Sequence, residues 1–586
     1  MNIAARNGLL VLFVLGTCFG QDIPREVPPR RSTQMTDGFG VNIALPREPR
    51  MPWTKTWTPL FDSGVKWVRV GQYENSSEKT SWDWVEQTPG HLAVLPDVDE
   101  AIRSLAENGV AIEIQLQYSN PLYVGDPASR PKHVVLPAPG IGPGDKPPNP
   151  IFLPPRTDEE IEALLRYIRF MVGRYRGVVK HWELWNEENE VYWGPHAKSK
   201  KEAAEKGRWY GNVLARVADA IHQTDPQAKV MFGGLSRVDL AFTEAALAEC
   251  GSKIDILAYH PYVGMGSNHA PEEADTLLNA AEFRERVLRV PGVRQDLEFW
   301  VNEWNCPPSY KDSNESLEAR YVPRFYVWSH ALHMRPFVWT FIPATDGNEG
   351  DQYGLIHGET GGPDAFTPRP ALKAMEVTNA LFGQTDVDSM AEYQIAEPER
   401  YSHGELRSYA FRDRASGKPI FAWWLAVVAD PADRFQPVET TIVVRDSSLQ
   451  QPVLIDTRTG VVKPLVWNDR GRGELRVPLT DTVMALADAS YLDWPELPEA
   501  PGGLQAKLEK GRVRLNWTSG DSAAGLKVER SVRQGPWQPA ATLAPGTVEW
   551  FEQLSAAGHV TYRVRAESKN GPSPWSNPAW VEGPAQ

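Results

Sequence analysis

The stretch that decides the fold is Val179-Lys180-His181-Trp182-Glu183-Leu184-Trp185-Asn186-Glu187-Glu188-Asn189-Glu190. It begins with the apolar character of a buried strand and ends in a cluster of carboxylates and amides. Burying an Asn-Glu pair at the end of an apolar strand costs stability unless the pair has a chemical use. The stretch therefore predicts that one of these carboxylates reacts, and that its partner group lies elsewhere in the chain.

Eight short apolar runs alternate with amphipathic helical patterns between residues 36 and 382. The runs cover residues 40–44, 65–70, 110–116, 178–185, 229–234, 254–259, 297–301 and 337–342. Strands that alternate with helices pair in parallel, and the closed form of that arrangement is the (β/α)8 TIM barrel. An open doubly wound sheet is the alternative, but no Gly-x-Gly-x-x-Gly motif follows the first run.

The clearest helical pattern follows Thr157, which opens a Thr-Asp-Glu-Glu capping sequence. Apolar side chains then recur on one face at Ile161, Leu164, Leu165, Ile168, Met171 and Val172. A second predicted helix covers residues 97–108 and is stopped by Gly109. The loop at residues 118–155 is rich in Pro and Gly and follows the third strand. We therefore expect it to shape a site at the carboxyl face of the barrel.

After the barrel, which we predict for residues 36–383, the pattern changes to short β runs separated by turn signals. This pattern predicts an antiparallel β-sandwich for residues 384–495. Beyond a Pro-rich hinge, residues 498–586 resemble a fibronectin type III module, which is a further β-sandwich. The resemblance makes Trp517 the core tryptophan and Tyr562 the corner tyrosine of that module, and it implies a spacer role.

Composition excludes some partners and indicates a cellular location. The 586 residues are enough for several domains, and the net charge of −14 argues against a nucleic-acid partner. Residues 1–20 have the short apolar run of a secretory signal peptide, so we expect a secreted, periplasmic or cell-surface protein. A lipid anchor at Cys18 is the alternative. No later run is long and apolar enough to be a transmembrane segment.

No motif for a cofactor or a disulfide framework is found. Cys250 and Cys306 follow the predicted leader, and their expected places at opposite ends of the barrel predict no bridge between them. The sequence shows no zinc spacing, phosphate loop or serine elbow, so we expect no cofactor and no metal. The acidic loop with Asp346, Glu349 and Asp351 is interpreted as a solvated rim, with a calcium site as the alternative.

The carboxyl ends of barrel strands meet on one face, so the residues there form the candidate site. The fourth strand ends in Asn186-Glu187 and the seventh in Glu303-Trp304, while the second, sixth and eighth supply Arg69, His260, Tyr262 and Trp339. Two carboxylates suit cleavage of a glycosidic bond, in which one protonates the leaving oxygen and the other meets the sugar carbon. Arg69 would keep one carboxylate ionised, and apolar walls would keep the other protonated.

These residues resemble those of clan A of the glycoside hydrolases. Over residues 36–495, the run 182–187 and the sequence His260-Pro261-Tyr262 are similar to family 39, which includes β-xylosidases and α-L-iduronidases. The resemblance implies that Glu187 is the acid/base and Glu303 the nucleophile. It further implies sugar contacts from Asn186 and Trp339, a contact of His260 with the sugar or with the acid/base, and an orienting role toward Glu303 for Arg69 and Tyr262. Trp304 is a further candidate contact to substrate, with packing as its alternative.

We therefore predict a secreted retaining glycoside hydrolase that cleaves β-glycosidic bonds of a polysaccharide or oligosaccharide. One alternative is an α-L-glycosidase of the arabinofuranosidase or iduronidase type, because the same scaffold serves such substrates. Another is a non-catalytic protein that binds glycans or mediates adhesion. The sequence departs from the family at residues 115–120, where a His-containing stretch is common.

Four other glutamates near the predicted site have structural interpretations. Glu183 and Glu113 lie inside predicted strands, so we expect them to be salt-bridged structural residues. Glu188 and Glu190 follow Glu187 and are predicted to be solvated or to support it.

Overall fold

The computed structural model describes residues 25–583 except 46–51, 74–75, 78, 135–149, 263–268, 274–279, 307–314, 344–352, 359–361, 398–403, 431, 493–497, 499–500, 519–524, 534–536, 555–557, 569–570, 574 and 577. It divides into two compact units, of which one is Glu26–Leu492 and the other contains Asp493–Gln586. The predicted leader, with Cys18, and the acidic loop with Asp346, Glu349 and Asp351 lie outside the described residues.

The larger unit contains a closed barrel of parallel strands, which confirms the predicted (β/α)8 fold. In chain order the strands are β2 (Gly40–Ile43), β3 (Trp67–Val70), β6 (Ala111–Leu116), β7 (His181–Leu184), β8 (Lys229–Ser236), β9 (Ile256–His260), β10 (Glu298–Val301) and β11 (Met334–Val338). All eight predicted runs contribute a strand, and the ring closes by pairing β11 with β2. The last strand begins three residues earlier than predicted.

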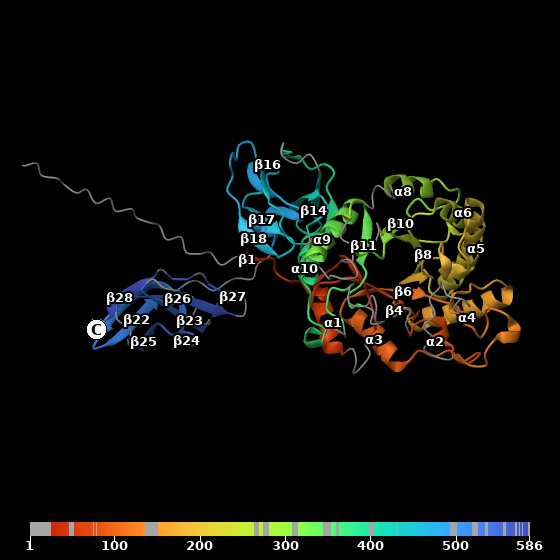
Figure 1. Ribbon diagram of the computed structural model, residues 1–586, viewed down its shortest axis with the longest axis horizontal. Coiled ribbons are helices and arrows are strands. Elements are labelled where there is room, and N and C mark those ends of the chain that lie inside the picture. Colours follow the sequence, from red (N-terminus) through yellow and green to blue (C-terminus); the bar gives the residue numbers. More distant parts are fainter. Residues whose placement is uncertain are drawn as a thin grey trace, which may run out of the picture. The chain divides into compact units, whose positions relative to one another are not determined.

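Helices surround the barrel, and Figure 1 shows α4, α5 and α6 on the outer side of strands β6 and β8. Their bounds are α1 (Trp53–Asp62), α2 (Trp82–Val85), α3 (Pro96–Glu107), α4 (Asp158–Arg174), α5 (Lys200–Thr224), α6 (Leu240–Cys250), α8 (Ala280–Leu288), α9 (Glu315–Ala331) and α10 (Pro370–Phe382). A small hairpin, β4 (Gln72–Tyr73) with β5 (Ser76–Ser77), follows β3. Thr157 and Glu160 form the capping box predicted for α4.

The interior of the barrel is filled by side chains rather than by solvent. Met231, Ile256, Ala258, Trp300 and Phe337 form one buried cluster, against which Trp67 packs. Such filling is typical of this fold and leaves the strand ends as the place for chemistry. Cys250 and Cys306 are both buried, and both are free thiols.

A β-sandwich packs next to the barrel in the same unit, beside α9 and α10 (Figure 1). One sheet joins β1 (Arg25–Glu26), β18 (Val461–Pro464), β17 (Pro452–Asp456), β20 (Met484–Asp488), β15 (Pro419–Ala426), β14 (Glu405–Asp413) and β12 (Thr385–Val387). The other joins β13 (Tyr393–Ile395), β16 (Val438–Val444) and β19 (Glu474–Leu479). Apolar side chains from both sheets, among them Trp423 and Leu475, form its core.

Two buried arginines of α9 bind the sandwich to the barrel. Arg324 pairs with Glu272 and donates to the carbonyl of Val427 at 2.9 Å. Arg320 donates to Asp481 at 2.9 Å and to the carbonyl of Asp430 at 2.6 Å. Charges buried this deeply persist only where they are paired, so these contacts fix the two layers together.

The second unit is also a β-sandwich, as its fibronectin-like pattern predicts. One sheet contains β21 (Gly502–Glu509), β22 (Arg512–Thr518) and β25 (Glu549–Gln553). The other contains β24 (Gln538–Leu543), β23 (Gly525–Val532), β26 (Gly558–Ser568), β27 (Gly571–Pro572) and β28 (Ala579–Gly583). Trp517 and Tyr562 both lie in its core, and the Tyr562 hydroxyl donates to Glu552 at 2.7 Å. Among the described residues of the whole chain, no helix is long and apolar enough to cross a membrane.

The buried pair between Arg324 and Glu272 predicts a large effect on stability. Arg324→Met removes the cation and leaves a buried carboxylate unpaired, so the free energy of unfolding of the larger unit should fall by about 3–5 kcal/mol. Urea unfolding followed by tryptophan fluorescence measures this. Arg216→Met, which removes surface ion pairs to Asp158 and Glu162, is the control and should cost about 1 kcal/mol or less. Equal losses for both variants would contradict the assignment.

Candidate active site

The structure brings most of the predicted site residues together at the carboxyl ends of the barrel strands. Asn186 and Glu187 follow β7, Glu303 lies just beyond β10, and Arg69 lies within β3. His260 ends β9, and Tyr262 follows it. One carboxylate oxygen of Glu187, one of Glu303 and a ring nitrogen of His260 all lie within 4.8 Å of one another.

Arg69 is the centre of the hydrogen-bond network beneath these groups. The residue is 1% exposed, and its guanidinium donates to Glu183 at 2.8 and 3.2 Å and to Asn186 at 2.9 Å. It also donates to Asn42 at 3.1 Å and to Glu303 at 3.0 Å. Burial by itself lowers the pKa of Arg69, but Glu183, Glu303 and Glu113 outweigh this effect and raise the pKa. Arg69 therefore stays charged and holds both Asn186 and Glu303 in place.

Glu303 is oriented by a donor on each of its oxygens. Arg69 donates to Oε2 at 3.0 Å, and the Tyr262 hydroxyl donates to Oε1 at 3.1 Å. Two donors thus fix the direction of this carboxylate, whose ionised form can attack an electrophilic carbon. A metal ion would have to displace these donors from the same oxygens, so the trio of Glu187, Glu303 and His260 is a poor cation site.

Glu187 lies in a different environment. Burial, with a smaller contribution from Glu190, raises the pKa of Glu187 to about 7. Its carboxylate lies 3.0 Å from Nδ1 of His260, and burial lowers the pKa of that imidazole to about 4, so the ring is neutral near pH 7. Glu187 can therefore carry a proton at neutral pH while Glu303 is held by a cation, which is the division of roles that acid–base chemistry needs.

The backbone around Glu187 is held in an uncommon conformation. Trp185 has φ 76° and Glu187 has φ 46°, both in the left-handed region that non-glycine residues seldom adopt. Such conformations concentrate at functional sites, where surrounding contacts impose them. The Glu187 amide donates to the carbonyl of Gly234 at 2.9 Å. A Cβ at Gly234 would lie 2.0 Å from Nε2 of His260, so glycine at this position lets the imidazole reach Glu187.

Glu183 and Glu113 are structural, as predicted. Glu183 accepts from Arg69, from Asn302 at 2.9 Å and from the Gly234 amide at 2.8 Å. Glu113 accepts from Asn302 at 2.8 Å, and burial followed by the charge of Glu183 raises the pKa of Glu113 well above its usual value. Both carboxyl groups therefore support the base of the site.

Sequence reasoning missed an aromatic wall beside Glu187. Tyr118, from the loop after β6, stacks on Tyr192, from the loop after β7, with ring centroids 6.1 Å apart. Phe152 meets both rings edge-on. Burial is the main cause that raises the pKa of each phenol, and the charges of Glu187 and Glu303 add to it, so both hydroxyls remain donors close to the carboxylates. The only sequence signal was the departure from the family pattern at residues 115–120, which include Tyr118.

The two predicted substrate-binding tryptophans, Trp339 and Trp304, differ in how exposed they are. Trp339 follows β11 and is partly exposed at the carboxyl face, where its ring is open to contact. Trp304 is 1% exposed and stacks on Phe325 of α9 with centroids 4.1 Å apart. A ring covered in this way has no face for a sugar, so the interpretation of Trp304 as a substrate contact is wrong and its packing alternative holds.

Glu188 is buried, so of its two predicted interpretations the solvated one is wrong and the supporting one remains. Neither of its carboxylate oxygens has a hydrogen-bond donor among the described residues. Burial raises the pKa of Glu188 well above its usual value. Glu190 is partly exposed and lies 3.1 Å from His196.

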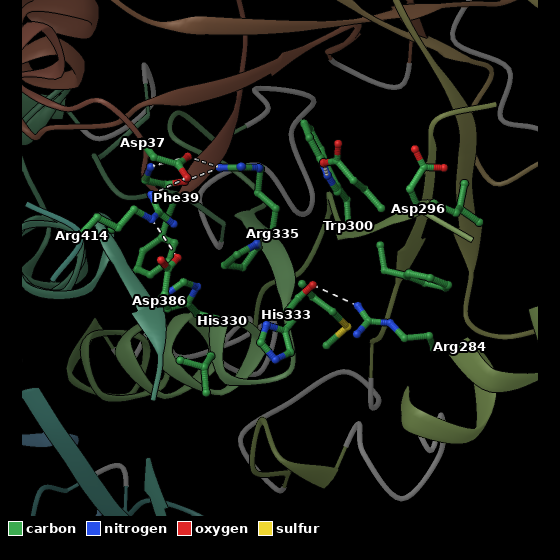
Figure 2. A pocket seen from close by; sticks show the side chains of 18 of the residues that line it. Asp37, Phe39, Arg284, Asp296, Trp300, His330, His333, Arg335, Asp386 and Arg414 are labelled. Carbon is green, nitrogen blue, oxygen red and sulfur yellow. Dashed lines mark hydrogen bonds and ion pairs between the residues drawn. The ribbon is translucent and has the colours of Figure 1, made fainter. Parts of the chain in front are cut away.

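A cavity of about 700 Å³ lies at the opposite, amino end of the barrel strands and is lined by Asp37, Trp300 and Arg335, among other residues. Figure 2 shows Arg335 and Arg414 both directed at Asp37, at 2.6 and 2.9 Å. The pair with Arg414 joins the barrel to the sandwich, and Arg335 lowers the pKa of Asp37 to about 2, although burial opposes the shift. The cavity is separate from the paired carboxylates, and the amino face of such barrels usually serves stability.

Comparisons with known proteins support the fold. No family model and no curated protein matches the sequence. A family 39 glycoside hydrolase from the gut symbiont Bacteroides cellulosilyticus WH2 is similar in structure, with a TM-score of 0.54 and 18% identity over 79% of this chain and 83% of that chain. An α-L-arabinofuranosidase from Thermotoga maritima has a TM-score of 0.48 and 13% identity over 79% and 98% of the two chains. An Fn3-like protein from Clostridium thermocellum is 26% identical over 16% and 98%, with a TM-score of 0.14. The first of these shows that the barrel and sandwich have the fold of a family 39 glycoside hydrolase.

The network around Arg69 predicts a pH-dependent loss of stability when the cation is removed. Arg69→Met leaves Glu113, Glu183 and Glu303 close together without a counter-charge, so at pH 7 stability should fall by about 3–5 kcal/mol. Protonation relieves the repulsion, so folding of the variant is favoured as pH falls and the deficit should shrink between pH 7 and pH 4.5. Urea unfolding at both pH values, beside the wild type, measures this. A stability deficit that is the same at both pH values would contradict the role of Arg69 as the counter-charge of these carboxylates.

Proposed function

We propose that this protein is a retaining glycoside hydrolase that cleaves β-glycosidic bonds of a polysaccharide or oligosaccharide. The observation that carries the proposal is the pair Glu187 and Glu303, whose oxygens lie within 4.8 Å across the barrel mouth in opposite electrostatic environments. Retaining enzymes hold their two carboxyl groups about 5–5.5 Å apart, whereas inverting enzymes need about 6.5–9.5 Å to admit a water molecule. The short separation favours retention.

In the first step Glu303 attacks the anomeric carbon, and a covalent ester forms as the bond to the leaving oxygen breaks. Glu187 gives its proton to that oxygen, so the leaving group departs as a neutral alcohol. In the second step ionised Glu187 takes a proton from water, whose oxygen attacks the same carbon and releases Glu303. Each step inverts the anomeric centre, so the net result is retention.

The surrounding residues have complementary roles in this proposal. Arg69 and Tyr262 orient Glu303, and neutral His260 holds the carboxyl group of Glu187. Asn186, fixed by Arg69 and by Gln115 at 3.1 Å, presents its amide to a sugar hydroxyl. Trp339 offers a ring face for the innermost sugar, and Tyr118 and Tyr192 offer hydroxyl donors.

The fold agrees with the proposal, because the structurally similar protein from Bacteroides cellulosilyticus WH2 is a glycoside hydrolase. A polysaccharide is too large to enter the cytoplasm, so an enzyme that cleaves one must be exported. The leader pattern at residues 1–20 supports export.

Substitution of each carboxylate should separate the two roles. Reducing-sugar release from a panel of plant, algal and microbial polysaccharides, together with aryl glycosides, first identifies a cleaved substrate. On that substrate Glu303→Gln should lose on the order of 10⁴-fold or more in kcat, and Glu187→Gln about 10²–10⁴-fold. Glu205→Gln, on the exposed surface of α5, is the control and should match the wild type. Proton NMR of the first product should show the anomeric configuration of the substrate.

Binding of a glycan by the wild type, unchanged in Glu303→Gln and without turnover of any substrate in the panel, would instead favour the non-catalytic alternative. An inverted first product would contradict the retaining mechanism.

The pH dependence of the reaction should report Glu187. The acid must be protonated in the first step, so kcat/KM should fall about tenfold per pH unit above the pKa of Glu187, which is about 7. Initial rates between pH 5 and pH 9 on an unactivated glycoside measure this limb. Glu187→Gln should lose the limb, since nothing remains to deprotonate there. A wild-type rate constant that is flat from pH 7 to pH 9 would contradict the assignment.

A further inference from the structure

The loop of residues 188–195, which directly follows Glu187, is unusually well packed. Its only regular element is the short turn η4 (Val191–Trp193), yet Glu188, Asn189, Trp193 and Gly194 are buried. Loops normally lie at the surface, because a buried loop contains carbonyl and amide groups that need partners. Something must therefore supply donors to the carbonyl groups of this loop.

Lys206 of α5 supplies them. Its side chain is almost completely buried, and Nζ donates to the carbonyl of Pro195 at 3.2 Å and to that of Glu190. The carbonyls of Asn189 and Gly194 lie 3.5 Å from the same nitrogen. An ammonium group has three N–H donors, so this one side chain can bind several carbonyl groups of the loop at once. Charge-assisted bonds of this kind are among the stronger hydrogen bonds in proteins.

Aromatic contacts and a paired amide fix the loop on its other sides. The ring of Trp193 packs against Trp185 and Tyr210, with centroids 4.7 and 5.3 Å away. Nε1 of Trp185 donates to the carbonyl of Tyr192 at 2.6 Å. The Asn189 side chain exchanges two hydrogen bonds of 2.9 Å with the backbone of Ser236 at the end of β8. The loop is thus bound to β8 and α5 at the same time.

Two residues that face the reaction depend on this loop. Glu187 lies at the start of the loop in a left-handed conformation. Tyr192 lies near the middle of the loop, and the charges of Glu187 and Glu303 add to burial in raising the pKa of its hydroxyl. Uncommon backbone conformations persist only where neighbouring contacts impose them. A loop released from Lys206 would leave the Glu187 carboxyl free to move away from the leaving oxygen, while Glu303 remains held by Arg69 and Tyr262.

We propose that Lys206 is a positioning residue for general acid catalysis, which places Glu187 and Tyr192 by gathering the carbonyl groups of residues 189–195. The proposal rests on the proposed function, and it assigns to Lys206 a role in leaving-group protonation only. The attack of Glu303 does not depend on Lys206 where the leaving group departs as a stable anion and needs no proton.

The dependence on the leaving group tests the proposal. A general acid contributes about 10²–10⁴-fold when the leaving group is a poor one, and little when it is already a stable anion. Lys206→Met should therefore lower kcat/KM about tenfold or more for a phenyl or alkyl glycoside, and by less than about twofold for the 2,4-dinitrophenyl glycoside of the same sugar. Lys206→Gln, which keeps N–H donors without the charge, should fall between. Lys201→Met, the same change at an exposed position of the same helix, should behave as the wild type.

Hydrogen exchange gives a readout that needs no substrate. Exchange of the Glu187 and Glu190 amides, which donate at 2.9 Å to Gly234 and Glu187, should be faster in Lys206→Met than in the wild type and in Lys201→Met. Unchanged exchange overturns the positioning role whatever the enzyme acts on. Equal loss of activity on both kinds of glycoside, or no loss on either, also overturns it. A wild type that cleaves no glycoside counts against the proposed function, and exchange then still decides whether Lys206 holds the loop.

Discussion

The guanidinium of Arg69 lies at the centre of a set of carboxylates that could not otherwise be buried together. Glu113, Glu183 and Glu303 converge on it from strands β6, β7 and the end of β10, and Asn42 and Asn186 complete its hydrogen bonds. A single cation that is fully hydrogen-bonded can hold several acids in an apolar interior, because its donors are shared among them. The strand ends are therefore fixed relative to one another by charge as well as by backbone pairing. This is why the two reacting carboxylates stand at a defined separation.

Glu187 and Glu303 are chemically identical, so the different roles proposed for them come entirely from their surroundings. Glu303 accepts from a guanidinium and a phenol, whereas Glu187 meets a neutral imidazole and buried aromatic walls. The first environment supplies a cation and a hydroxyl donor, and the second raises the pKa of Glu187 to about 7. His260 stays neutral because burial and the charge of Arg69 both lower its pKa, with the carboxylates opposing them. A positive imidazole in that position would lower the pKa of Glu187 and weaken it as an acid.

Sequence alone predicted the barrel and the approach of Glu187 to Glu303, because both follow from local patterns. The eight apolar runs identify the strands, and the topology of a parallel barrel then brings Asn186-Glu187 and Glu303 to one face. Sequence reasoning failed where the role of a residue depends on the direction of its side chain after the strand ends. Trp304, for example, turns outward onto Phe325. Sequence reasoning also missed contacts between segments far apart in the chain. Tyr118 and Tyr192 stack across two loops, and Lys206 reaches carbonyl groups 11 to 17 positions before it. In the sequence Glu188 is a charged residue of a loop, which predicts exposure to solvent, and only the fold shows that it is buried.

Helix α9 connects the sandwich to the segment of Glu303, the proposed nucleophile, which gives the second layer of the larger unit a part in the candidate site. On one side the helix supports the segment after Glu303, where Phe325 stacks on Trp304 and Glu318 accepts from Asn305 at 3.0 Å. On another side Arg320 and Arg324 of the same helix are buried against the sandwich. Because a helix is stiff along its length, its position relative to β10 is set partly by what holds those arginines. The sandwich thus acts as a support for the segment that carries Glu303, although none of its residues is among those placed here in the catalytic network. A barrel separated from the sandwich would expose both arginines, leave Arg320 without Asp481 and lose that support, so the two layers form one folding unit.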